Sequence, residues 1–110
     1  QKIVEFQKAL DRKKMNLLPA INTEFHDLLY GLSKSPKLIS MINALRDQIY
    51  RYREMILKES KFASTSNQDH KKMLKYIRKR DASETERLVR EHILRGQEMV
   101  LQEYDRQRLD

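Results

Sequence analysis

The chain has 110 residues, of which 39% are apolar and 35% are charged, with only two glycines and two prolines. A mass of 13.3 kDa suits a single domain with one core. The scarcity of helix breakers favours long helices over sheets. The lack of cysteine excludes disulfides and thiolate metal sites, and no apolar run is long enough to cross a membrane. The net charge of +7 makes nucleic acid a partner to consider.

The N-terminal half is predicted to form three helices. The first covers residues 1–14, and the second covers residues 19–32 after a short connector. Ser35 and Pro36 are residue types preferred at a helix N-cap and first position, so a third helix is expected from there to about Glu59. Its apolar side chains recur every three or four residues and should face the core: Leu38, Ile42, Leu45, Ile49, Tyr52 and Ile56.

The C-terminal half is predicted to form two more helices. Residues 62–66 read as a mostly polar turn, so a fourth helix is expected to begin at Thr65 or Ser66. A fifth helix follows the sequence Asp81-Ala82-Ser83-Glu84, which matches a capping box, and runs to near the end of the chain. No strand alternation, hairpin signal or internal repeat interrupts this pattern. We therefore predict an all-α antiparallel bundle of about five helices, forming one domain over residues 1–110.

The chain has three histidines, and each is predicted to lie on or beside the apolar face of a different helix: His26, His70 and His92. Helical bundles build metal sites in this way. Asn22 precedes His26 by one helical turn, so its amide oxygen shares that face. Three imidazoles and one oxygen suit a divalent ion such as Zn²⁺ or Ni²⁺. The spacing alone is equally compatible with three unrelated histidines in the core or on the surface.

The residues around these histidines resemble a two-block family pattern. The first block of that family, Asp-x-x-Phe-His, an aliphatic pair and Asn-x-x-Leu, is matched here by Asn22-Thr23-Glu24-Phe25-His26, Leu28-Leu29 and Ser35-Pro36-Lys37-Leu38. The second block, an acidic residue before His, an aliphatic pair, Asp and a final His, is matched by Asp69-His70, Met73-Leu74, Asp81 and His92. This pattern resembles the FCD domain, the ligand-binding C-terminal domain of GntR transcriptional regulators of the FadR subfamily.

The resemblance implies a helical bundle that binds a divalent metal through one Asp and three His. It also implies that a small organic acid binds at that metal and alters DNA affinity. Carried over by position, the metal ligands are Asn22, His26, His70 and His92. A cytoplasmic homodimer is expected, with DNA bound by a winged helix-turn-helix domain. That domain and the first helix of the family's sensor domain are expected to precede Gln1.

Two positions depart from the family pattern. Asn22 stands where the family has Asp, so one ligand is neutral and we expect weaker metal binding through its carbonyl oxygen. A metal-free structural dimerisation bundle is therefore an alternative reading. Ser35 stands where the family often has Asn, and the two residue types are near-equivalent as N-caps.

Three residues on one flank of the predicted third helix are candidates for contact with a carboxylate: Arg46, Tyr50 and Arg53. Arginine offers a bidentate fork for such a ligand. The competing interpretation is that these arginines are solvated and lay their stems along the edge of the core.

The predicted fourth helix carries six cations within ten residues, with no acidic residue among them: Lys71, Lys72, Lys75, Arg78, Lys79 and Arg80. This cluster supports an alternative function, a basic helical module that binds nucleic acid directly. A solvated helix end explains it as well, since cations are favoured near a helix C-terminus. Glu24 and Glu91 lie near the histidines in sequence but form no recognised catalytic motif, so we do not expect an enzyme.

Overall fold

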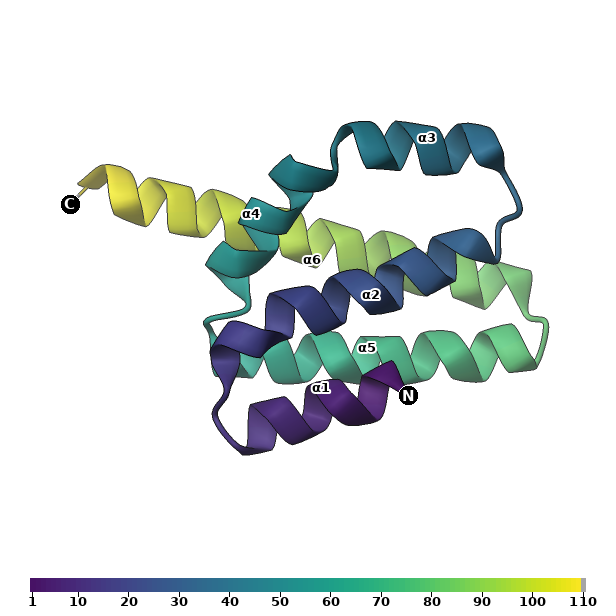
Figure 1. Ribbon diagram of the computed structural model, residues 1–110, viewed down its shortest axis with the longest axis horizontal. Coiled ribbons are helices and arrows are strands. Elements are labelled where there is room, and N and C mark those ends of the chain that lie inside the picture. The colour runs from purple at the N-terminus through teal and green to yellow at the C-terminus, as the bar shows by residue number, and fades with distance from the viewer. Residues whose placement is uncertain (110) are drawn as a thin grey trace.

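The computed structural model describes the backbone of residues 1–109 and the side chains of residues 1–107. Within these residues the chain is all-α, with six helices and no strand. The elements are α1 (Lys2–Asp11), a 3-10 turn η1 (Met15–Leu17), α2 (Leu18–Gly31), α3 (Pro36–Ala44), α4 (Arg46–Ile56), α5 (Ser60–Arg78) and α6 (Ala82–Leu109). Helices α1, α2, α5 and α6 form the body of the bundle, α4 crosses α6, and α3 lies apart along one edge (Figure 1). The prediction of a helical bundle is confirmed.

The predicted third helix is two helices. The chain bends at Leu45, whose N–H bonds the Ile42 carbonyl three residues back and so tightens the end of α3. Beyond the bend, α4 turns onto α2 and α6. Of the six stripe residues expected in the core, only Ile56 is buried, and Leu38 and Leu45 are 41% and 52% exposed. The apolar periodicity correctly predicted helix, but it did not predict burial. The bend directs α3 away from the core, and α3 buries no side chain.

Two other helix boundaries differ from the prediction. Helix α5 begins at Ser60, so the expected polar turn over residues 62–66 is helical. Ala63 is buried in the same core cluster as Phe6 and Ala9 of α1, and Ser66 is buried where it lines a cavity with residues of α2 and α6. The Thr65 hydroxyl is satisfied by the Lys61 carbonyl at 3.1 Å. Helix α1 ends at Asp11, three residues earlier than expected.

The caps predicted at Ser35 and Asp81 are confirmed, whereas the cap expected at Thr65 or Ser66 is wrong because both residues lie inside α5. The Ser35 hydroxyl accepts the Leu38 N–H at 3.2 Å at the start of α3. The Asp81 carboxylate accepts the Glu84 N–H at 3.1 Å before α6. Each side chain satisfies a backbone donor that the first turn of a helix leaves free.

The core consists of two clusters of buried apolar residues. One contains Phe6, Ala9, Leu18, Ile56, Leu57 and Ala63, and the other contains Ile3, Phe25, Met73 and Leu88. The His70 ring contacts one phenylalanine of each cluster, stacking on Phe25 at 4.2 Å and meeting the edge of Phe6 at 6.3 Å between ring centroids. The two halves of the core thus meet around a histidine. None of the described helices combines the length and apolarity that a membrane span requires.

Candidate metal centre

The three histidines meet at one point inside the bundle. His26 comes from α2, His70 from α5 and His92 from α6, and they are 7%, 1% and 9% exposed. One nitrogen from each ring can be chosen so that all three lie within 4.8 Å of one another. The Nε2 atoms of His70 and His92 are 3.3 Å apart. The structure therefore brings together three predicted ligands that lie up to 66 residues apart in sequence.

Packing holds the imidazole rings in place. Phe25 stacks against His70 at a centroid distance of 4.2 Å, while the edge of His26 meets His70 at 5.0 Å. His92 lies nearly parallel to His26 at 5.5 Å. Each ring is thus confined by aromatic neighbours before any ligand binds, which lowers the entropic cost of binding an ion there.

Asn22 is the fourth predicted ligand, and its amide oxygen is unsatisfied. The residue lies one turn before His26 in α2 and is 5% exposed. Within the described part of the chain, its Oδ1 atom is buried and accepts no hydrogen bond. A buried acceptor without a partner is rare because it loses its hydration without compensation. Asn22 lines a cavity together with His26 and His92. Three imidazole nitrogens with an oxygen nearby are donor types that fit a divalent transition metal.

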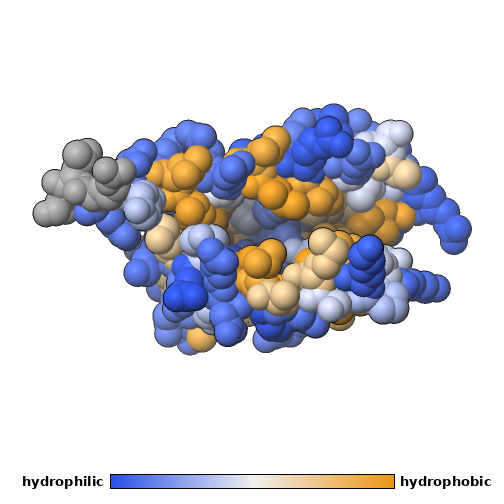
Figure 2. Space-filling view, turned by 90° about the horizontal axis from the view of Figure 1, so that it is seen from above, coloured by the Kyte–Doolittle hydropathy of each residue, from blue (hydrophilic) through white to orange (hydrophobic). Residues whose placement is uncertain are grey.

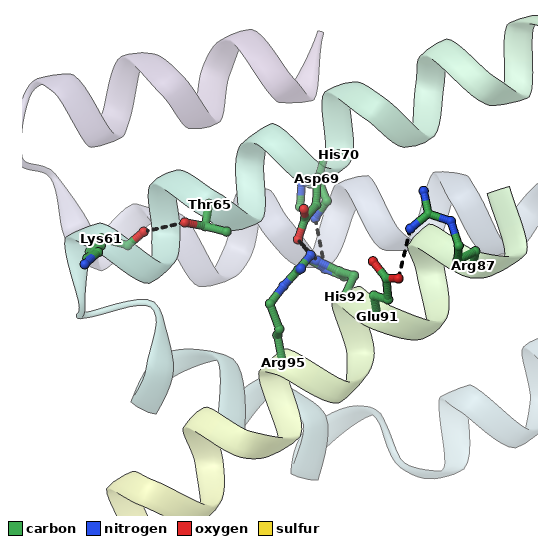
Figure 3. Close-up of polar contacts among 8 residues, drawn as sticks. All are labelled: Lys61, Thr65, Asp69, His70, Arg87, Glu91, His92 and Arg95. Carbon is green, nitrogen blue, oxygen red and sulfur yellow. Dashed lines mark hydrogen bonds and ion pairs between the residues drawn. The ribbon is translucent and has the colours of Figure 1, made fainter. Parts of the chain in front are cut away.

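Asp69 orients His92 from behind (Figure 3). Its Oδ2 atom lies 3.0 Å from Nδ1 of His92, and the same oxygen accepts a hydrogen bond from the Arg95 guanidinium. When Nδ1 of His92 carries the proton and donates it in a hydrogen bond to Asp69, Nε2 is unprotonated. The lone pair of Nε2 then faces His70. The carboxylate therefore selects the tautomer of His92 that can bind a metal.

The role of Asp69 was not predicted from the sequence. The residue was matched to the acidic position before His70, yet it acts on His92, which follows it by 23 residues on another helix. No helical spacing rule connects the two side chains. The acidic residue beside a predicted ligand was the only signal available, and it pointed to the wrong histidine.

Burial keeps the three imidazoles neutral. Desolvation is the main cause that lowers the pKa of His26 well below its ordinary value and that of His70 to about 3. Desolvation also lowers the pKa of His92, although Asp69 acts against it. The positive charge of Arg53 lowers all three further. At neutral pH the cluster is in the unprotonated form that metal ions bind.

A cavity of about 600 Å³ adjoins the histidines. Asn22, His26 and His92 form part of its lining, and Arg53 of α4 faces it from the opposite side. Arg53 donates to the Thr23 hydroxyl at 3.1 Å and forms no ion pair with any acidic residue in the described part of the chain. An unpaired guanidinium beside a candidate metal site is a suitable contact for an anionic ligand.

The other two carboxylate-contact candidates lie elsewhere. Arg46 forms a two-bond ion pair with Asp27 of α2, with N–O distances of 3.1 and 2.6 Å, and does not line the cavity. Tyr50 is half-buried and also lies outside the lining. The cavity is lined by another side of α4, which carries Ile49, Arg53 and Ile56. Of the three candidates, only Arg53 lines the cavity.

The remaining sequence candidates are solvated. The six cations near the C-terminus of α5 are all exposed, and none forms an ion pair with a described acidic residue. The Lys75 and Lys79 ammonium groups lie 5.7 and 5.8 Å from the centre of the Tyr76 ring. Glu24 pairs with Lys2 at 2.5 Å and Glu91 pairs with Arg87 at 2.9 Å, so neither carboxylate is directed at the histidines.

Comparison with family models decides the class of protein. Residues 1–95 match the model of the FCD domain. The chain belongs to the FCD domain family. FCD domains are the C-terminal ligand-binding domains of GntR-family regulators, which bind DNA through a separate domain, and they are not catalytic. The expected resemblance and the exclusion of an enzyme are thereby confirmed. Searches among curated proteins and among solved structures gave no match.

Proposed function

We propose that this FCD domain senses a small carboxylate through a divalent metal held by Asn22, His26, His70 and His92. The regulator is assigned to the FadR subfamily on the two sequence blocks described above. The observation that carries the proposal is the convergence of three buried, neutral imidazoles, and the unpaired oxygen of Asn22 beside the same cavity supports it. Once bound, the ion supplies a Lewis-acidic anchor for a carboxylate.

Zn²⁺ or Ni²⁺ is the ion that we propose, because imidazole nitrogens bind both. The Nε2 atoms of His70 and His92 already lie 3.3 Å apart, so little rearrangement is needed for both to bind one ion. Asn22 in place of an acidic ligand leaves the site with a full positive charge of two to be balanced by the effector.

The proposed signal is a movement of α4 relative to the rest of the bundle. Arg53 on α4 faces the histidines across the cavity, so a carboxylate between them draws the two sides together. We further propose that the domain works as a homodimer in the cytoplasm and that this movement changes the spacing of the attached DNA-binding domains. The accessible surface of 7907 Å² supports dimerisation, since a compact monomer of this mass exposes only about 6,500 Å².

Metal content is the first test. Elemental analysis of the purified protein should find about one equivalent of Zn²⁺ after incubation with the ion, and His92→Ala should lose it. Asn22→Ala should weaken binding, whereas Asn67→Ala should not. Asn67 is the matched control because it is also buried with an unpaired Oδ1 atom, but it bonds the Ile3 carbonyl and Gln7 on the side facing α1. Wild-type protein without metal would instead support the metal-free dimerisation bundle.

Direct nucleic-acid binding is the second candidate function, and the six exposed cations at and just after the C-terminal half of α5, which form no ion pair with a described acidic residue, favour it. Contacts to phosphate release counterions, so the affinity would fall steeply as the salt concentration rises. Gel-shift titration of this chain with duplex DNA at low and moderate salt tests the candidate. An absence of binding at low salt would eliminate it and leave the cations as a solvated helix end.

A further inference from the structure

The cavity beside the histidines has a mainly apolar lining with a few polar groups. The histidines and the one permanent charge are provided by His26, His92 and Arg53, next to Asn22. The apolar lining residues are Ile49, Ile56, Phe62, Ile93, Val100 and Leu101, and further polar atoms come from Tyr30, Tyr52, Ser66 and Gln97. Seen from the side on which α3 lies, hydrophobic atoms gather along both sides of a central hollow (Figure 2). A ligand that fills this space meets imidazole and guanidinium groups and, over most of its remaining surface, hydrocarbon.

The charges of the lining allow one carboxylate and no more. Arg53 is the only lining side chain with a permanent charge, and the lining contains no acidic residue. A carboxylate held between Arg53 and the histidine cluster therefore uses the only charged contact that the protein itself offers. A second carboxylate at the far end of the ligand would lie beside Ile49 and Leu101, where the lining offers no cationic partner, and it would replace hydrocarbon that could cover the apolar wall.

The apolar walls are also open to water. Ile93 is 59% exposed and Leu101 is 52% exposed, although both lie beside the cavity. Covering such surface with a hydrocarbon ligand is favourable, by about a four-fold gain in affinity for each buried methylene group. The apolar walls should therefore bind an acid with an apolar body more tightly than a very small acid that has none.

We propose that the effector is a monocarboxylic acid with an apolar body, aliphatic or aromatic, rather than a small polycarboxylate. The carboxylate head lies between the metal site and Arg53, and the body lies between α4 and α6. This inference rests on the proposed function, because the head binds at the proposed metal site.

Three acids test the inference by isothermal titration of the zinc-loaded protein. Acetate is the head alone, hexanoate adds an apolar body, and adipate has the same chain length with a second carboxylate at the far end. Hexanoate should bind at least about ten-fold more tightly than acetate or adipate. Adipate binding as tightly as hexanoate, or acetate binding as tightly as hexanoate, would overturn the inference and leave the proposed function intact.

The same titrations on chelator-treated protein separate the two failures. Each acid should bind more weakly without zinc, because the head loses its anchor. If none of the three acids binds the zinc-loaded protein, or if zinc makes no difference, the proposed function fails and the inference fails with it.

Two variants of α6 test where the apolar part of the ligand binds. Leu101→Ser should reduce the preference for hexanoate over acetate several-fold, since it removes part of the wall. Leu94→Ser is the control because Leu94 lies on the same helix, is 54% exposed and does not line the cavity. An unchanged preference in Leu101→Ser, or an equal loss in both variants, would contradict the placement of the body between α4 and α6.

Discussion

The two sides of the cavity are built very differently. The histidine side comes from α2, α5 and α6, where His70 is 1% exposed and lies between two buried core clusters. The opposite side comes from α4, which buries only Ile56, and α4 is joined to α3, which buries nothing. The histidines therefore lie in the packed core, whereas Arg53 lies on a helix with few buried side chains. Under the proposed function, the packed side binds the ion and the less buried side responds to the ligand.

Removal of His70 should have the largest effect. His70→Ala leaves a void between Phe25 and Phe6 and removes one metal ligand. We expect loss of stoichiometric zinc and a decrease in the free energy of unfolding of about 3 kcal/mol. Denaturant unfolding of the metal-free protein measures the second quantity. A variant as stable as the wild type would show that the histidine side is not part of the core.

Lowering the pH should destabilise the metal-free protein, because the buried His70 resists protonation in the folded state. The folded-state pKa of His70 is lowered to about 3, whereas an unfolded histidine has a pKa near 6.5. Between these values the unfolded state binds more protons, so stability is complete above pH 6.5 and falls as the pH decreases. His70 alone should cost about 2 kcal/mol between pH 6.5 and 5. Unfolding curves at several pH values test this, and a flat profile would contradict burial of neutral imidazoles.

Asp69→Asn should weaken zinc binding by about ten- to hundred-fold, because the carboxylate no longer fixes the tautomer of His92. Asp27→Asn is the control, since Asp27 pairs with Arg46 at the surface. Competition with a chromogenic chelator measures both affinities. Equal affinities in the two variants would remove Asp69 from the metal centre.

On the α4 side of the cavity, Arg53→Met should weaken carboxylate binding by about ten-fold while zinc affinity is retained. Arg46→Met should leave both affinities unchanged, because Arg46 is paired with Asp27 outside the cavity. Titration with hexanoate separates the two arginines. A loss of zinc in Arg53→Met would show that α4 supports the ligands as well as the effector.

The smallest effect is expected on α3. Met41 is 60% exposed, so Met41→Ser should change the free energy of unfolding by no more than about 0.5 kcal/mol. Denaturant unfolding at low protein concentration measures this value for the monomer. A large destabilisation would mean that α3 packs more tightly than its exposure indicates, and the contrast between the two sides would disappear.

Much of the site could be predicted from the sequence, because local patterns carry it. The apolar periodicity around His26, His70 and His92 assigned each to the inner face of a helix, and the motif blocks grouped them as one ligand set. Asn22 followed from its position one turn before His26. The caps at Ser35 and Asp81 were also local, since each bonds a backbone N–H three residues away.

The failures all concern contacts between distant segments. The bend at Leu45 lies in a sequence without glycine or proline, so no local signal marked it. The start of α5 was not predicted because residues 60–66 are mostly polar in the sequence, although Ala63 and Ser66 are buried in the fold.

The sequence by itself determined the helical class and the caps at Ser35 and Asp81, and it nominated the histidines that meet in the core, since these depend on residue types within one or two helical turns. Only the tertiary structure decided that Asp69 acts on His92, that Arg53 and not Arg46 faces the cavity, and that the walls are apolar. The physical reason is distance along the chain. A helical repeat tells which residues share a face, but the partner of that face is set by how whole helices pack, which no local pattern encodes.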